Sequence, residues 1–393
     1  MVNLEPGTDR TAVYEPTGVD WALVERARAL ALALREAGPR IDAERRLDEL
    51  AAAMAHRRLL RPVCPRRHRR QSRSGHRHPR RGGGSPRRGS AGWLCMIAGA
   101  GSLKLGWLPL AVVRAMAVER GSLHLAGSAR TLGAAEAVPG GYRVTGRWDF
   151  QSGINHAAWM YGICRETSAA GAPARLVIAP VDAGEIIDTW SVMGMRGTGS
   201  HDFALTDVFV PAERTLPFLP DCSPANPLFT PRLYLVWTWA LNAAVGLGIG
   251  QGALDTFMDL AARHGTSGST TLLRDRAEAQ TAVGRAEAML SAARAYVYTS
   301  LARAWQTVQT EGADPTIAIA HTRLAITHAV REALGVVDLL FHTAGTNAIY
   351  ARNRLERSFR DIHVAVQHGS TLTQHYTSAG RIFLGLAPPD RGW

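Results

Sequence analysis

Four long segments with helical periodicity fill the C-terminal part of this chain. Their apolar residues recur at three- and four-residue spacing, which places them along one face of a helix. The segments are separated by short breaks and cover Tyr234–Arg263, Leu273–Gln309, Pro315–Phe341 and a last one that begins near Leu355. Long amphipathic helices with short connections pack as neighbours around a shared apolar core. The pattern therefore predicts a C-terminal four-helix bundle.

A period of two residues, typical of strands, precedes this bundle between Leu123 and Glu213. Two apolar runs flank Pro139-Gly140-Gly141, so the stretch from Ala134 to Phe150 is predicted to form a β-hairpin. Further strands are predicted at Trp159–Arg165, Ala174–Pro180, Ile186–Val192 and Asp202–Val210. The middle of the chain is therefore expected to form a β-domain.

The N-terminal part is predicted to be helical again. Residues 19–55 show helical periodicity interrupted by Gly38-Pro39, and the stretch from Gly89 to Met116 is rich in apolar and small residues, as in helices packed beside a cavity. We therefore predict an α+β chain with three parts. These are an N-terminal helical domain over residues 1–122, a middle β-domain over residues 123–216 and a C-terminal bundle over residues 217–393.

One stretch, residues 57–88, departs from the rest in composition. It contains 13 arginines and no acidic residue, and the other 32 basic residues of the chain balance its 33 acidic ones. Three interpretations are open. The stretch could be a polyanion-binding arm, because clustered arginines neutralise phosphates. It could be a disordered linker rich in Gly, Pro, Ser and Arg. It could also be an out-of-frame translation of a GC-rich gene, since Lys104 is the chain's single lysine.

Cysteine use and hydropathy predict a cytoplasmic protein. The four cysteines, Cys64, Cys95, Cys164 and Cys222, are widely spaced, which indicates reduced thiols rather than disulfides or a zinc site. The first residues lack the basic-then-apolar pattern of a secretory signal, and apolar runs such as Leu105–Val113 are too short to cross a bilayer. We expect neither a metal nor a membrane partner.

Five segments carry the polar, aromatic and glycine residues of a candidate site. They are GYRVTGRWDFQSG at 141–153, WSVMGMRGTGSHDFALTDVFVPAERT at 190–215, ARHG at 262–265, FHTAGT at 341–346 and RDIHVAVQHGST at 360–371. Each alone is compatible with an ordinary strand, turn or helix end. Taken in this order along an α, β, α layout, they resemble the flavin-dependent monooxygenases built on the acyl-CoA dehydrogenase fold. The resemblance covers nearly the whole chain and fails at the Arg-rich stretch.

The resemblance implies a flavin site in the β-domain. Trp148 and Phe150 are expected to wall the flavin ring, and Ser152 to donate a hydrogen bond near its reactive nitrogen or a flavin hydroperoxide. Thr198 and Ser200 are expected to supply further hydroxyls, and Gly197 and Gly199 to let the backbone approach the cofactor. In the bundle, Arg263 would reach a flavin phosphate, and Thr343 and Gly345 would belong to a loop that meets the flavin of a neighbouring subunit.

The segment at 360–371 distinguishes an oxygenase from a dehydrogenase. An acyl-CoA dehydrogenase needs a carboxylate to remove a proton from its substrate. The corresponding position here holds Gly369, and His368 precedes it. The resemblance assigns His368 a catalytic role, in which a neutral imidazole removes a substrate proton or holds a peroxide oxygen. Arg360 and Asp361 are expected to pair with each other as a structural ion pair.

The chain is thus predicted to be a two-component flavin monooxygenase. Reduced flavin, FMNH2 or FADH2, would come from a separate reductase, because no nicotinamide-binding motif is visible. Oxygen would add to the flavin as a C4a-hydroperoxide and pass to a small or medium aromatic substrate. Oxidation of sulfur or of an amino-sugar nitrogen, which the resemblance also allows, stays open. The segment from Ala98 to Gly106 is expected to line the substrate side. The resemblance also implies a homotetramer, or at least a dimer, with shared sites, and no nucleic-acid partner is expected.

Three alternatives remain open at this stage. The chain could be an acyl-CoA dehydrogenase with bound FAD whose base lies elsewhere in the bundle, for example at Glu278 or Glu287. It could be a non-enzymatic polyanion-binding protein that uses the Arg-rich stretch. It could also be an inactive product, if residues 57–88 replace helices that cover the substrate side.

Overall fold

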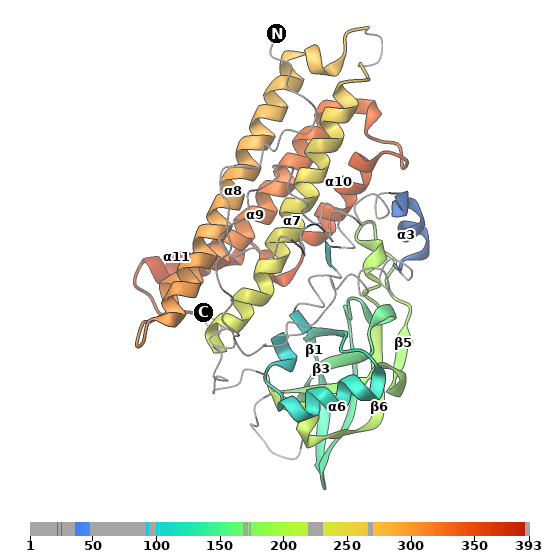
Figure 1. Ribbon diagram of the computed structural model, residues 1–393, viewed down its shortest axis with the longest axis vertical. Helices are drawn as coiled ribbons and strands as arrows, with labels where there is room; N and C mark the ends of the chain where they lie inside the picture. Colours follow the sequence, from blue (N-terminus) through green and yellow to red (C-terminus); the bar gives the residue numbers. More distant parts are fainter. Residues whose placement is uncertain are drawn as a thin grey trace.

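The computed structural model describes residues 36–47, 103–167, 174–218, 231–265 and 270–389, with a few isolated positions such as Gly92, Trp93, Ala100 and Gly101. A bundle of long helices stands above a mixed β-sheet, and short helices lie beside the sheet (Figure 1). The predicted α+β class is therefore confirmed. The Arg-rich stretch at 57–88, most of the predicted helices at 19–55 and three cysteines (Cys64, Cys95 and Cys222) lie outside the described residues.

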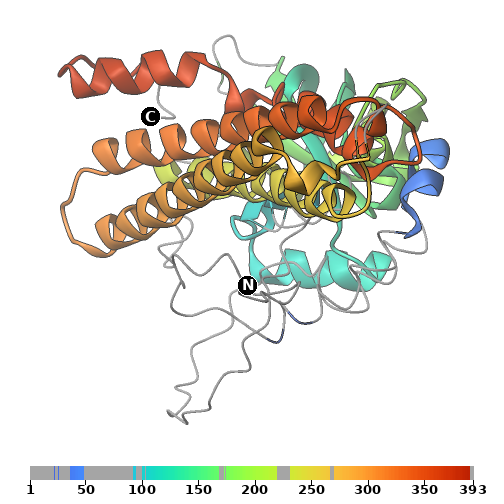
Figure 2. The ribbon, with the colours of Figure 1, turned by 90° about the horizontal axis from the view of Figure 1, so that it is seen from above.

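Three long helices form the body of the bundle: α7 (Pro231–Ala261), α8 (Ala277–Gln309) and α9 (Thr316–Ala344). Seen from above, they run alongside one another (Figure 2). Small residues let α7 and α9 approach closely: a Cβ on Gly246 would lie 2.9 Å from a methyl of Val330, and one on Gly250 would lie 3.3 Å from the Cβ of Ala333. The three predicted long helices are thus confirmed.

The fourth segment of the bundle is not one helix. It consists of α10 (Arg354–Ala365) and α11 (Gln374–Phe383), separated by a short 3-10 turn at Gly369–Thr371. His368 begins this turn, because its side chain accepts a hydrogen bond from the Ser370 backbone N–H. A side chain that bonds its own backbone in this way competes with helix continuation. The break therefore places His368 at a helix end rather than on a helix face.

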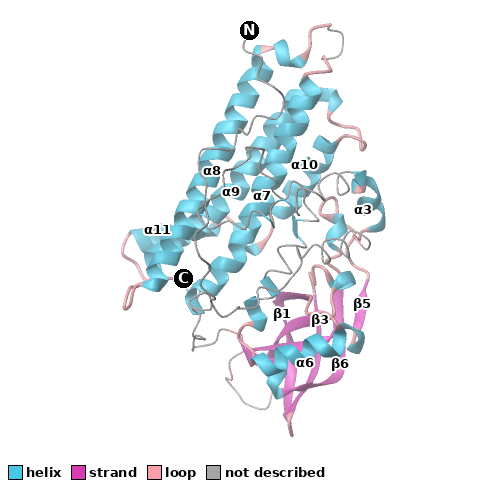
Figure 3. Ribbon diagram, viewed as in Figure 1, coloured by secondary structure: helices cyan, strands magenta, loops and turns pink. Residues whose placement is uncertain are grey.

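The seven-stranded sheet has the order β5-β6-β2-β1-β3-β4-β7. Figure 3 shows its strands in magenta below the helical bundle. Only β1 and β3 pair in parallel; the other pairs are antiparallel. The strands are β1 (Leu125–Val138), β2 (Gly141–Trp148), β3 (Trp159–Glu166), β4 (Arg175–Pro180), β5 (Glu185–Ile187), β6 (Asp202–Pro211) and β7 (Thr215–Pro217). The predicted hairpin is β1–β2, in which Val138 pairs with Gly141.

Two predictions for the sheet need correction. The strand expected at Ile186–Val192 is only three residues long, because after Ile187 the chain leaves the sheet and turns toward the bundle. The short strand β7, which was not predicted, closes the edge beside β4. Both differences lie where the β-domain meets other parts of the protein, and there tertiary contacts outweigh local strand propensity.

Two short helices connect the sheet to its surroundings: α3 (Gly38–Glu44) and α6 (Leu110–Arg120). Val112, Val113 and Met116 of α6 pack on one face of the sheet with Trp159 and Ile163 of β3. Within α7, Leu233–Ala261 is apolar enough by length and composition to cross a membrane, but 61% of its most apolar window is buried. Burial of this kind is typical of a core helix.

Candidate active site

Three hydroxyl side chains from the predicted flavin segments meet in the β-domain. The Ser200 Oγ lies 2.7 Å from the Ser152 Oγ and 2.7 Å from the Thr198 Oγ1, and all three side chains are buried. Two backbone hydrogen bonds hold their loops together: Gln151 N–H donates to His201 O, and Gly153 N–H donates to Thr198 O, both at 2.9 Å. We call Ser152, Thr198 and Ser200 the hydroxyl chain.

The hydroxyl chain has one donor more than its internal contacts use. Three hydroxyls carry three protons, and two hydrogen bonds within the chain use two of them. The remaining proton belongs to one of the three hydroxyls, and the direction of the two hydrogen bonds decides which one carries it. A buried hydroxyl without an acceptor is destabilising. The arrangement is therefore suited to a bound molecule that presents a hydrogen-bond acceptor.

The loops around the hydroxyl chain are held in left-handed backbone conformations. Gly153 and Gly199 have φ values of 80° and 49°, and two non-glycine residues, Phe150 and Met195, have φ values of 57° and 54°. A side chain at Gly199 would also collide with Asn155, because a Cβ there would lie 2.5 Å from the Asn155 Nδ2. Left-handed non-glycine residues are unfavourable and concentrate at ligand sites.

The two predicted wall residues have different environments. Trp148 is fully buried: its indole N–H donates to Ile163 O at 3.0 Å, and its ring lies against Gly133 and Gly162. Stacking on a ligand would require this ring to leave the sheet interior. Phe150 is 44% exposed and meets Trp190 edge to face at 5.9 Å. Phe150 is therefore the ring of this pair that is available for a ligand.

His368 is held between α7 and the turn after α10. Its Nδ1 lies 2.8 Å from the Asn242 side-chain amide and 2.8 Å from the Ser370 Oγ. The Ser370 backbone N–H also donates to this Nδ1. A backbone N–H can only donate, so Nδ1 is an acceptor and the ring proton is on Nε2. Burial lowers the pKa of His368 to about 4, and the ring is therefore neutral at pH 7.

An acyl-CoA dehydrogenase has a carboxylate base at this site. Within the described part of the chain, no carboxylate contacts His368 in its place. Gly369 offers no side chain, and its position is exposed. Glu278 lies exposed in the first turn of α8, and Glu287 accepts a hydrogen bond from Ser291 on the same helix. Neither glutamate takes part in the contacts of His368 or the hydroxyl chain.

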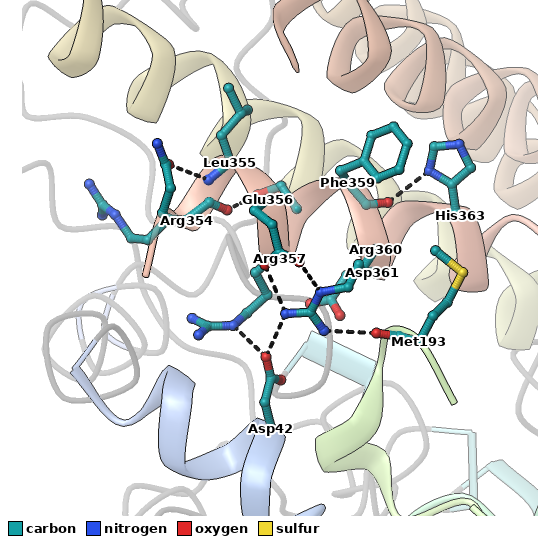
Figure 4. Close-up of polar contacts among 12 residues, drawn as sticks. Asp42, Met193, Arg354, Leu355, Glu356, Arg357, Phe359, Arg360, Asp361 and His363 are labelled. Atoms are coloured by element: carbon teal, nitrogen blue, oxygen red, sulfur yellow. Dashed lines mark hydrogen bonds and ion pairs between the residues drawn. The ribbon is translucent and has the colours of Figure 1, made fainter. Parts of the chain in front are cut away.

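The prediction that Arg360 and Asp361 form an ion pair is wrong. Arg360 instead bonds Asp42 of α3, Glu356 one turn earlier and the backbone O of Met193, while Arg357 bonds the same Asp42 (Figure 4). Neighbouring residues on a helix point in different directions, which is why this pair does not form. The network joins α3, the loop before the hydroxyl chain and α10.

Asp361 faces inward instead. Its Oδ1 accepts the backbone N–H of Met195 at 2.6 Å, and the side chain is buried. Burial raises the pKa of Asp361 to about 7, although the hydrogen bond from Met195 opposes this shift. The contact fixes the left-handed Met195 at the base of the loop that carries Thr198 and Ser200.

The other predicted cofactor residues lie at one end of the bundle, apart from the contacts of the hydroxyl chain. Arg263 is exposed just after α7, and Gly345 ends α9 with φ 57°. The Thr343 hydroxyl donates to Leu339 O within its own helix. Asn347 ties the two helix ends together by donating to Gly265 O and Ala344 O. The chain therefore presents two separate groups of candidate residues.

Asn242 is the site residue that sequence reasoning missed. It is a buried amide in the otherwise apolar run of α7 and contacts both His368 and Ser370. A single amide on an apolar helix face was the available signal, because buried polar groups need partners. Among the described residues, no group of three or more His, Cys, Asp or Glu could hold a metal ion.

Comparison with known proteins decides the family. Residues 240–372 match the model of the acyl-CoA dehydrogenase C-terminal domain. The chain is 33% identical to indole-3-acetate monooxygenase from Pseudomonas putida over 303 residues. The aligned residues cover 76% of this chain and 77% of that protein. The chain belongs to the flavin-dependent monooxygenases of the acyl-CoA dehydrogenase fold. The predicted family, enzyme class and flavin dependence of this oxygenase are thus confirmed.

Two further similarities agree with the assignment. One is to the oxygenase component of FADH(2)-dependent resorcinol hydroxylase from a Rhizobium strain. The two sequences are 33% identical over 184 residues, which cover 43% of this chain and 44% of that protein. The fold of this chain matches that of XiaF from Streptomyces, solved with FADH2 and glycerol, with a TM-score of 0.81 at 23% identity, over 94% of this chain and 97% of that one. The latter likeness supports the fold alone.

Proposed function

We propose that this enzyme is the oxygenase component of a two-component system and hydroxylates a small or medium aromatic compound. The similarity to indole-3-acetate monooxygenase and to the resorcinol hydroxylase component supports an aromatic substrate. The observation that carries the site is the hydroxyl chain, a buried donor system with one unused proton. Reduced flavin, as FMNH2 or FADH2, would arrive from a separate reductase, as expected for an oxygenase component.

The residues of the β-domain fit a flavin. The unused proton of the hydroxyl chain suits a ring nitrogen or oxygen, and the exposed face of Phe150 suits an aromatic ring. We assign Ser152, Thr198, Ser200 and Phe150 to flavin binding, with Trp148 supporting them from inside the sheet. Bound reduced flavin supplies the electrons that activate O2 for transfer of one oxygen atom to the substrate.

We assign His368 the role of a hydrogen-bond donor. With Nδ1 accepting from the Ser370 N–H, the Nε2–H is the ring group left to bond a ligand, and a protonated Nε2 cannot remove a substrate proton. Of the two roles that the family resemblance offers, this tautomer favours holding an oxygen atom by donation. Asn242 would act as a positioning residue that fixes the ring.

Arg263, Thr343 and Gly345 would complete the flavin site of a neighbouring copy. Arg263 and Gly345 are exposed at the bundle end and Thr343 is half-buried beside them, apart from the contacts of the hydroxyl chain, which supports this assignment. It requires an oligomer, for which a homotetramer is the proposed form. We further propose a soluble, cytoplasmic enzyme without a nucleic-acid partner.

The function is tested by supplying photoreduced FMN or FAD, O2 and an aromatic probe, and by measuring hydroxylated product against hydrogen peroxide. Indole-3-acetate and resorcinol are suitable first probes. Product formation in excess over peroxide supports the proposal. Electron transfer from an acyl-CoA to a dye, without any hydroxylated product, would overturn it in favour of a dehydrogenase.

A further inference from the structure

Lys104 is a buried cation at the junction between the sheet and the bundle. It is 6% exposed and lies in the short helical turn before α6. Its ammonium lies 4.4 Å from the ring centre of Tyr161 on β3 and 5.5 Å from that of Tyr234 on α7, and both tyrosines are buried. We call Lys104, Tyr161 and Tyr234 the lysine cluster.

Within the described part of the chain, no carboxylate lies within ion-pair distance of this ammonium. Attraction to two aromatic faces offsets only part of the unfavourable transfer of an ammonium out of water. Burial accordingly lowers the pKa of Lys104 to about 7. A methionine would fill the same volume without this penalty, so packing alone does not account for a lysine here.

The lysine cluster shares its elements with the proposed active site. The Gln151 side-chain amide, next to Ser152 in sequence, donates to the Tyr161 backbone O at 3.5 Å. On α7, Tyr234 precedes the His368 partner Asn242 by eight residues, which is about 12 Å along a helix axis. Gln151 thus links the loop of the hydroxyl chain to β3, and Asn242 links His368 to α7; these are the two elements whose tyrosines flank the ammonium.

We infer that Lys104 is a specificity-determining residue that binds a carboxylate on the substrate, at a position away from the carbon that is oxygenated. A carboxylate would supply the missing counter-charge, and the two tyrosine rings would enclose the contact and exclude water. The substrate would then be an aromatic acid rather than a neutral aromatic. This inference rests on the proposed function, because it takes the region between β3 and α7 as the substrate side.

Ligand binding tests this inference without any oxygenation step. Indole-3-acetate and its neutral isostere indole-3-acetamide are titrated into the full chain with oxidised flavin present and no reductant. The wild-type protein is expected to bind the acid about 30-fold more tightly than the amide, the range expected when a charged group gains a buried partner. The Lys104→Met variant is expected to bind both probes with equal affinity, because only the acid uses the ammonium.

Equal binding of the two probes by the wild-type protein would overturn the inference. Retained preference for the acid in Lys104→Met would overturn it as well. The wild-type comparison can overturn the inference even if the variant does not fold. Preference for the acid without any hydroxylation under reduced flavin would instead count against the proposed function alone.

Discussion

At the scale of single residues, His368 provides the sharpest prediction. Replacement by alanine removes the Nε2–H donor and is expected to lower product formation by about 100-fold, as for loss of one preorganised donor at a reacting oxygen. His368→Gln should retain more activity, because its amide can donate. His363→Ala is the matched control: this histidine lies on α10 and contacts Phe359 O, outside the proposed site. An equal loss in both alanine variants would contradict the assignment.

The lowered pKa of His368 makes a prediction about pH dependence. With its pKa lowered to about 4, the ring stays neutral throughout the range from pH 6 to pH 8. The steps that depend on His368 should therefore be independent of pH in this range. A profile of product formation that rises with an apparent pKa near 6.5, and loses that rise in His368→Gln, would show that the ring titrates and would contradict the neutral donor.

Ser152 tests the hydroxyl chain. Ser152→Ala should release more hydrogen peroxide per flavin oxidised and form about tenfold less product, because one hydrogen bond to the cofactor is lost. The control is Ser291→Ala, which removes a half-buried hydroxyl that donates to Glu287 within α8, outside the proposed site. Unchanged coupling in Ser152→Ala, measured as the ratio of product to peroxide, would remove this residue from the site.

Asp361 makes a prediction about stability. The folded state raises its pKa to about 7 from an ordinary value near 3.8, so the folded protein binds more protons than the unfolded chain between these values. The stability that the folded protein gains from the protonated Asp361 carboxyl is fully present below pH 4 and is lost as the pH rises through 7. Asp361→Asn keeps an acceptor for Met195 and cannot ionise, and it should be more stable than the wild type at pH 8 by up to about 4 kcal/mol.

Urea unfolding of both proteins at pH 5 and pH 8 measures this difference. The wild type should lose more free energy of unfolding between the two pH values than the Asn variant does. A parallel loss in both proteins would show that the Asp361 carboxylate is not the group responsible.

At the scale of elements, the loop that carries Thr198, Gly199 and Ser200 is expected to tolerate no side chain at its glycine. Gly199→Ala forces a left-handed alanine against Asn155 and should destabilise the protein by about 1–2 kcal/mol and weaken flavin binding. Gly284→Ala is the matched control, since it lies in α8 with open space around it and should stabilise the helix by about 0.5–1 kcal/mol. Thermal unfolding and flavin titration of both variants check the pair.

The elements also show what the sequence could and could not predict. Helical period and turn residues located α7, α8, α9 and the β1–β2 hairpin, because these elements are long and locally consistent. The break at His368 was missed, since it depends on a side chain that bonds its own backbone. Asp42 was missed as a partner of Arg360 because it lies 318 residues away in sequence, and no local pattern reports such a contact.

Only part of the candidate site could be predicted, because some of its features depend on contacts between distant parts of the sequence. Motif resemblance assigned Ser152, Thr198 and Ser200 to one site, and the structure brings them within hydrogen-bond distance. The identity of the proton-bearing nitrogen of His368, the burial of Trp148 and the cluster around Lys104 depend on packing between distant elements. None of these can be obtained from periodicity or from spacing.

At the scale of the whole molecule, the proposed sharing of sites between subunits can be tested directly. Light scattering is expected to give a mass of four 42.4 kDa chains. Arg263→Ala should weaken flavin binding about tenfold, as for loss of a charged contact to a phosphate, without changing that mass. A monomer that binds flavin with the affinity of the assembled protein would contradict a shared site.

The most direct test of the central claim is to mix the protein anaerobically with photoreduced FMN or FAD, add oxygen and record the absorbance with time. A monooxygenase of this family should pass through a long-lived oxygenated flavin, distinct from both the reduced and the oxidised spectrum. Immediate return of oxidised flavin, both in this chain and in a version with residues 57–88 rebuilt in an alternative reading frame, would contradict the assignment of this protein as an oxygenase.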